Sequence, residues 1–144
     1  MGKVVITDFI EVDDDLRPER AVLDGIAEVS AIAARDDVEL NGKIKDAVAL
    51  ITFHYSVITP ASLDRLQCCK VIARAGVGYD NVDIVAARAR GIPVVNVPDY
   101  GSEEVADTAI GMTLALTRGV HYFNSRLRAG LGDWNYTEAA PLYR

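Results

Sequence analysis

The sequence predicts an α/β protein: a parallel five-stranded sheet with flanking helices, followed by one long C-terminal helix. Three observations support this prediction. Short apolar runs alternate with polar segments that contain Gly and Pro, as strands alternate with helices in a parallel sheet. The run at residues 47–53 is apolar nearly throughout, which is typical of a strand covered on both faces. From Ser102 onward, apolar residues instead recur at helical spacing.

The order of the expected elements follows from this alternation. Five strands are expected, at residues 3–7, 28–33, 47–53, 71–73 and 93–96. Helices are expected between them, at residues 18–25, near 42–46, at 60–66 and at 82–90. Pro18 and Pro60 suit the first turn of a helix, because the N–H that proline lacks would have no partner there. Gly25 and Gly91 suit helix ends, where glycine readily adopts a left-handed backbone.

The segment from Ser102 to Ala129 predicts a single linking helix of about 27 residues, roughly 40 Å long. Ser102 can cap its N-terminus, and Glu103 and Glu104 suit the positive end of a helix dipole. Apolar residues follow in steps of three and four: Val105, Ala109, Met112, Leu116, Val120, Phe123 and Leu127. A stripe of this length requires cover, and we expect a homodimer through this helix to supply it. The alternative is that the helix folds back on its own sheet.

Composition excludes several classes of function. The net charge of −6 and the isoelectric point of about 4.8 argue against binding nucleic acid or an anionic membrane. No apolar run approaches the roughly 20 residues that span a bilayer. The N-terminal residues turn polar too early for a signal peptide, so a cytoplasmic location is expected. Cys68 and Cys69 are adjacent, which predicts reduced thiols rather than a framework disulfide or a zinc site.

An acidic cluster, Asp13, Asp14 and Asp15, follows the first predicted strand. Such carboxylates can bind a metal, or form the acidic pocket of a phospho-receiver domain. A receiver domain also needs a phosphorylatable Asp after the third strand and a Lys after the fifth. This sequence has His54 at the first of those places and the turn at residues 96–99 at the second. We therefore interpret the cluster as a solvated loop and expect no metal site.

The most informative stretch begins as a buried strand, places Arg74 at the carboxyl end of that strand, and continues with Gly76 and Gly78. Glycines allow backbone N–H groups to approach a ligand closely. A helix that opens near Asn81 or Val82 would add partial positive charge. A cation beside exposed amides suits a small anion, such as a carboxylate or phosphate. A tight strand-to-helix turn with a solvated arginine is an equal alternative on this pattern alone.

The same loop imitates a dinucleotide-binding fingerprint, with Gly76, Gly78 and Asn81 at its three positions and Asp99 near the acidic one. The match is poor, because a small residue normally allows close helix–strand packing where Asn81 stands. Asp99 also lies beyond the end of the next strand. A pyrophosphate site is therefore not expected in this loop.

His54, Arg74 and Asn96 each stand at the carboxyl end of a predicted strand. The carboxyl ends of parallel strands meet at one edge of the sheet, and ligands of such sheets bind beyond that edge. We therefore expect the three side chains to converge on one crevice.

Three blocks of sequence, in order, resemble the D-isomer-specific 2-hydroxyacid dehydrogenases. They are RAGVGYDNVD at residues 74–83, GIPVVNVP at residues 91–98 and EVADTA at residues 104–109. The closest resemblance is to the branch that includes the C-terminal-binding-protein corepressors, and it covers residues 48–144 well. It implies a flavodoxin-like substrate-binding (catalytic) domain at residues 1–100. Residues 101–144 would then be the linking helix and the start of an NAD-binding domain.

The resemblance also implies residue roles. Arg74 and the backbone amides of Val77 and Gly78 would hold the carboxylate of a small 2-hydroxy or 2-keto acid. His54 would form a wall of the substrate pocket. Val77 and Thr108 would contact the cofactor, NAD or alternatively NADP.

No residue of this chain matches the catalytic Arg, acidic residue and His of the family. The resemblance therefore implies a truncated NAD-dependent oxidoreductase that is inactive alone. His121 is expected to be a surface residue of the long helix rather than a catalytic one. The alternative function is that of a protein-binding module resembling the corepressors.

Overall fold

The computed structural model describes residues 1–11 and 14–130. Internal contacts divide the chain into two compact units, Met1–Tyr100 and Gly101–Arg144. The first unit holds the sheet and its helices, and the second holds two further helices.

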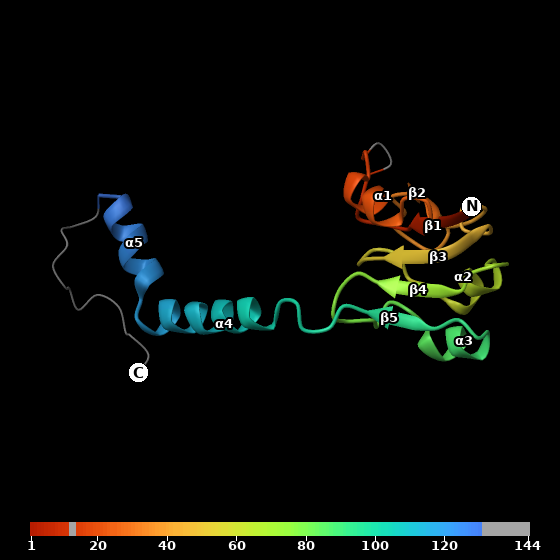
Figure 1. The fold of residues 1–144 in the computed structure, drawn as a ribbon. Helices are drawn as coiled ribbons and strands as arrows, with labels where there is room; N and C mark the ends of the chain where they lie inside the picture. Colours follow the sequence, from red (N-terminus) through yellow and green to blue (C-terminus); the bar gives the residue numbers. More distant parts are fainter. Residues whose placement is uncertain (12–13, 131–144) are drawn as a thin grey trace. The chain divides into compact units, whose positions relative to one another are not determined.

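A five-stranded parallel sheet organises the first unit, and its strands all point the same way (Figure 1). The strands are β1 (Gly2–Ile6), β2 (Ala27–Ala31), β3 (Ala47–Thr52), β4 (Val71–Arg74) and β5 (Val94–Asn96). Their order in the sheet is β2-β1-β3-β4-β5, with every neighbouring pair parallel. This is the flavodoxin-like order, and the predicted fold class is confirmed.

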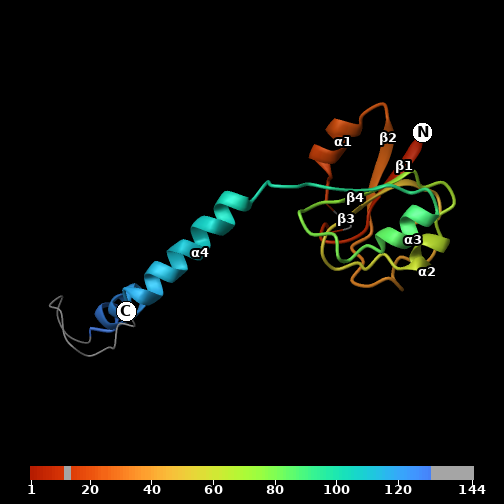
Figure 2. The same cartoon turned by 90° about the horizontal axis from the view of Figure 1, so that it is seen from below.

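Helices cover both faces of this sheet (Figure 2). Helix α1 (Arg17–Leu23) lies on one face, and α2 (Pro60–Asp64) and α3 (Ile84–Ala89) lie on the other. On the α2 and α3 face, Leu50 and Ile72 pair in register across β3 and β4, and both are fully buried. Burying an aliphatic side chain of this size stabilises a fold by about 1.5–3 kcal/mol, so the register of the central strands is strongly specified.

The helix expected near residues 42–46 is not formed, and this prediction was wrong. The segment is a series of turns in which the Lys43 amide donates to the Leu40 carbonyl and the Ala47 amide donates to the Ile44 carbonyl. Gly42 has a φ of 75°, which ends any right-handed helical run there. Burial of Leu40 and Ile44 in the core fixes these turns instead.

In the acidic loop after β1, the described carboxylates of Asp14 and Asp15 accept hydrogen bonds from nearby backbone amides. Asp14 accepts a hydrogen bond from the Leu16 amide, and Asp15 accepts one from the Arg17 amide, at the start of α1. Asp13, the first residue of the predicted cluster, lies outside the described residues.

The second unit contains α4 (Ser102–Thr117) and α5 (Val120–Arg128), so the expectation of one continuous helix was wrong. Gly119 separates them with a φ of 67°, and its amide donates to the Leu116 carbonyl. This is the usual way in which a left-handed glycine ends a helix. The Thr117 hydroxyl also bonds back to the Thr113 carbonyl, and such side-chain bonds weaken a helix locally.

Helix α4 exposes a large apolar surface. None of its residues is buried, and five large apolar side chains are exposed: Val105, Ile110, Met112, Leu114 and Leu116. Across the described ranges, no helix combines the length and the hydropathy that crossing a bilayer would require.

The break between α4 and α5 is expected to depend on Gly119. Gly119→Ala places a Cβ on a left-handed backbone, which costs about 1 kcal/mol. Because this strain disappears in a continuous helix, the variant is expected to gain helical signal in far-ultraviolet circular dichroism. Gly130→Ala, another left-handed glycine at the end of α5, is the matched control. An unchanged helical signal would show that other contacts hold the break.

Candidate functional site

The candidate site lies at the carboxyl ends of β3 and β4. Arg74 is the last residue of β4, and His54 lies in the segment that follows β3. An Arg74 Nη2 atom lies 3.0 Å from His54 Nδ1. A guanidinium only donates hydrogen bonds, so in this pair Nδ1 is the acceptor and the imidazole proton is on Nε2. The predicted convergence of these two residues is thus present.

The Arg74 side chain is buried. Only 8% of its surface is exposed, and its Nε atom is buried without an acceptor in the described part of the chain. A Cβ on Gly76 would lie 1.7 Å from Arg74 Nη1. A side chain at position 76 would therefore displace the guanidinium from its present place, which the sequence pattern did not reveal. The solvated arginine considered from the sequence is not what forms.

The loop after Arg74 presents backbone donors. Among the residues that the structure describes, the amides of Val77 and Gly78 donate to no protein acceptor. The loop is fixed from β5, because Asn96 Nδ2 donates to the Val77 carbonyl at 2.7 Å and the Val97 amide donates to the Gly76 carbonyl. Asn96 therefore anchors the loop, and its expected convergence with His54 and Arg74 on one crevice stays a prediction.

Asn81 joins the glycine loop to the segment after β3. Its Nδ2 atom donates to the carbonyls of Phe53 and Ser56, at 3.2 and 2.9 Å. Its own backbone carbonyl accepts from the Ile58 amide. Asn81, which does not fit the dinucleotide fingerprint, thus links the glycine loop to the segment after β3.

The helix after this loop begins later than expected. Helix α3 starts at Ile84, and its N-cap is Asp83, whose carboxylate accepts from the Ala86 amide. The prediction of a helix opening near Asn81 or Val82 was wrong. A six-residue helix capped by its own carboxylate offers no further positive end to an anion, so the free loop amides are the donors that matter.

Asp8 organises the segment that carries His54, and the sequence analysis missed it. The side chain is fully buried directly beyond β1. It accepts hydrogen bonds at 2.6–3.2 Å from the hydroxyls of Thr7 and Thr52 and the amides of Phe53, Tyr55 and Ser56. The available signal was an Asp ending an apolar strand, at the edge where ligands bind.

The ionised form of Asp8 is the one that this arrangement favours. Burial is the largest single influence and raises the pKa. The hydrogen bonds from Phe53, Thr7, Tyr55 and Ser56 outweigh it together, so the pKa lies below its ordinary value of 3.8. A buried carboxylate is therefore stable here because each oxygen has its donors.

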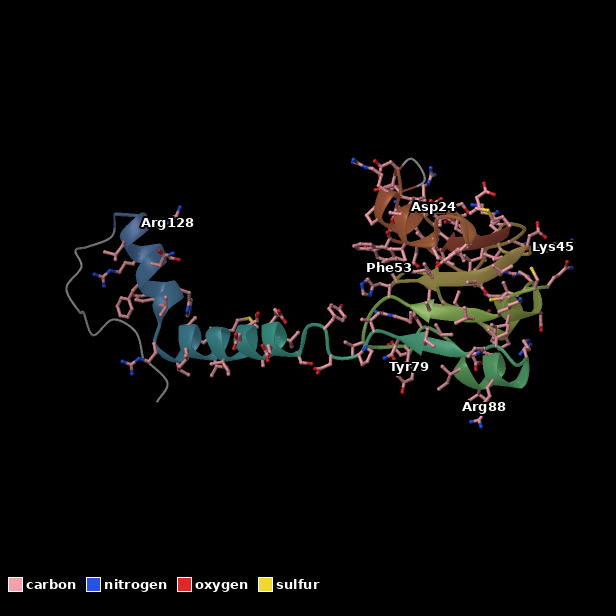
Figure 3. The ribbon with its side chains drawn as sticks, viewed as in Figure 1. Asp24, Lys45, Phe53, Tyr79, Arg88 and Arg128 are labelled. Carbon is pink, nitrogen blue, oxygen red and sulfur yellow. The ribbon has the colours of Figure 1, made fainter. Side chains whose placement is uncertain are left out.

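The predicted site residues fall into two groups. His54, Arg74, Val77 and Gly78 all lie at the carboxyl end of the sheet in the first unit; Figure 3 labels Phe53 and Tyr79 at the same end. Thr108 is exposed on α4, in the second unit, so its contact with a cofactor stays a prediction. His121 is exposed on α5, as expected.

An oriented guanidinium beside unoccupied loop amides, beyond a parallel sheet, is typical of α/β domains that bind small anionic molecules. Comparison with known families identifies this domain more narrowly. The model of the D-isomer specific 2-hydroxyacid dehydrogenase catalytic domain matches residues 4–141, and the chain belongs to that family.

Individual relatives agree with this membership. The D-3-phosphoglycerate dehydrogenase of Methanocaldococcus jannaschii is 34% identical over 143 residues, which are 99% of this chain and 26% of that protein. The NADPH-dependent glyoxylate/hydroxypyruvate reductase of Sinorhizobium meliloti, solved with citrate, is 31% identical with a TM-score of 0.75. That match covers 99% of this chain and 42% of the reductase.

A third similar structure, of a protein from Thermus thermophilus, is 30% identical with a TM-score of 0.76. It covers 95% of this chain and 43% of the solved one. This chain therefore spans about a quarter of the curated dehydrogenase and less than half of the solved structures. The finer expectation of a place in the corepressor branch is not shown by these relatives.

Asp8→Asn is expected to destabilise the first unit by about 2 kcal/mol at pH 7. The substitution replaces one carboxylate oxygen by an NH2 group, which cannot accept hydrogen bonds from the donors around it. The folded-state pKa of Asp8 is depressed, so its contribution is complete above pH 3.8 and is lost as the pH falls through the folded value. The difference in unfolding free energy between the two proteins should therefore shrink below pH 3.8. Urea denaturation at about pH 7 and about pH 3 measures this, and a constant difference would contradict it.

Proposed function

We propose that the unit Met1–Tyr100 binds the carboxylate of a small 2-hydroxy or 2-keto acid, as the substrate-binding domain of an NAD-dependent D-2-hydroxyacid dehydrogenase. The observation that carries the proposal is Arg74, held by His54 beside the unoccupied amides of Val77 and Gly78. A guanidinium and two amides match the several lone pairs of a carboxylate.

Each residue of the site has a distinct part in this proposal. Arg74 pairs with the substrate carboxylate, and the loop amides receive its second oxygen. His54 carries its proton on Nε2, and this N–H is available to a further oxygen of the substrate. The solved reductase was crystallised with citrate, and another structure of it holds NADP and malonate, so that relative accepts carboxylates.

The cofactor part of the proposal concerns the whole protein. NAD, or NADP as in the solved reductase, would exchange a hydride with C2 of the acid. The glycine loop of this chain does not suit the pyrophosphate, because Asn81 is committed to two carbonyls and Asp83 caps the helix. Val77, 48% exposed on the loop, and Thr108 are proposed to contact the cofactor.

A protein-binding module like the C-terminal-binding-protein corepressors is the alternative, and it rests on sequence resemblance alone. The curated relative reported above is a dehydrogenase, and this favours the enzyme.

Arg74→Lys is expected to weaken binding of glyoxylate or pyruvate to the 144-residue chain about tenfold, since lysine lacks the planar fork that binds both His54 and a carboxylate. Isothermal titration calorimetry measures this directly. Arg90→Lys is the matched control, because Arg90 pairs with Asp64 beside α3. Equal affinities for all three proteins, or no binding by the parent chain, would overturn the proposed role.

We further propose that α4 pairs with a second copy of the chain, because its exposed apolar side chains form a surface of the kind that is rare on monomers. Met112→Asp combined with Leu116→Asp is expected to yield a monomer with the sheet unit still folded. Asn124→Asp with Ser125→Asp adds the same charge on exposed positions of α5 and serves as the control. Multi-angle light scattering at micromolar concentration decides the point, and a monomeric parent chain would refute the pairing.

A further inference from the structure

A cavity of about 420 Å³ adjoins the candidate site, at the carboxyl ends of β1 and β2. Its lining residues are Phe9, Glu11, Ala33, Ala34, Arg35 and Tyr55. Its volume lies in the range of small-molecule sites. The carboxylate site uses none of these residues, so the cavity is not yet explained.

The cavity and the carboxylate site share a wall. The Phe9 ring lies edge-on to the His54 ring, with centroids 5.9 Å apart, and His54 in turn contacts Arg74. Tyr55 follows His54 in the chain, and its amide is fixed by Asp8. A molecule whose carboxylate is held at Arg74 therefore has His54 and Phe9 as its next neighbours on this side.

The aromatic part of this wall is exposed, and one of its rings is stacked on a neighbour. Phe9 and Tyr55 are each 57% exposed, although both are large and one is wholly apolar. The Phe9 ring stacks on Phe53, with centroids 5.0 Å apart and an interplanar angle of 22°. Figure 3 labels Phe53 at this end of the sheet. Stacking holds the Phe9 ring in place while leaving its other face available to a planar group.

Two residues of the cavity also adopt a backbone conformation that side chains disfavour. Phe9 has a φ of 73° and Ala33 a φ of 49°. In the described ranges, only Leu16 and Asp99 are further non-glycine residues with positive φ. Such strain persists where the surroundings impose it, and it gathers at ligand sites. Phe9 contacts both Phe53 and His54 from such a backbone.

We propose that this cavity receives the C3 substituent of the substrate and that the substituent is aromatic, so that the site selects aryl 2-keto acids. The inference rests on the proposed carboxylate site at Arg74. The ring of the substrate lies against Phe9 and Tyr55, and Arg35 and Glu11 line the polar part of the cavity, where a ring hydroxyl would find partners.

Calorimetric titration of the 144-residue chain with phenylpyruvate and with pyruvate tests the proposal. Phenylpyruvate is expected to bind at least tenfold more tightly. Phe9→Gly removes the ring and also relieves the positive φ, so this variant is expected to fold. It should lower the affinity for phenylpyruvate about tenfold and leave the affinity for pyruvate unchanged. Tyr55→Ala is a second variant with the same expectation, and Tyr100→Ala, an exposed tyrosine outside the cavity, is the control.

The remaining outcomes separate this inference from the function on which it rests. Equal binding of both acids, weakened about tenfold by Arg74→Lys, would overturn aryl selection and leave the carboxylate site standing. Absence of binding by either acid would overturn both. Tighter binding of 3-phosphohydroxypyruvate than of phenylpyruvate would show that the cavity selects a phosphate, and would overturn the aromatic class alone.

Discussion

The candidate site depends above all on the buried carboxylate of Asp8. Five donors converge on it, and three of them are backbone amides of the segment that follows β3. A buried charge is costly unless it is fully hydrogen-bonded, so the chain can bury Asp8 only by folding the segment from Phe53 to Ser56 around it. That fold places the His54 ring on Arg74, and it places Tyr55 beside the cavity. The need to hydrogen-bond one buried carboxylate thus shapes both the carboxylate site and the neighbouring cavity.

The glycine loop is fixed by a second, independent set of contacts. Asn81 bonds to the carbonyls of Phe53 and Ser56, and Asn96 bonds to the Val77 carbonyl. These contacts satisfy loop carbonyls and leave the amides of Val77 and Gly78 as the unoccupied groups. A loop whose acceptors are used and whose donors are available is preorganised for an anion. Arg74 supplies the formal charge and is itself oriented by His54 and by the space above Gly76.

The glycine loop resembles a dinucleotide-binding fingerprint in spacing, but it does not offer the same groups to a ligand. Gly76, Gly78 and Asn81 have nearly the spacing of a dinucleotide fingerprint. The third glycine of that motif serves close packing of a helix N-terminus that faces the pyrophosphate. In this chain that position is Asn81, whose side chain donates hydrogen bonds to the segment after β3. The helix begins only at Ile84, with Asp83 as its N-cap. Spacing is similar, but the groups that would meet the ligand differ.

The sequence by itself determined the sheet, because short apolar runs bounded by Gly and Pro are typical of the buried strands of a parallel sheet. It also determined that His54, Arg74 and Asn96 share one edge, since parallel strands bring their carboxyl ends together. Tertiary structure decided what these residues contact. The role of Asp8 depends on amides 45 to 48 residues away, and the close approach of Gly76 to a guanidinium depends on where the Arg74 side chain lies. Neither leaves a local pattern. Likewise, periodicity could not show that Gly119 would adopt a left-handed backbone and divide α4 from α5, because a glycine within a helix and a glycine that ends one look alike in sequence.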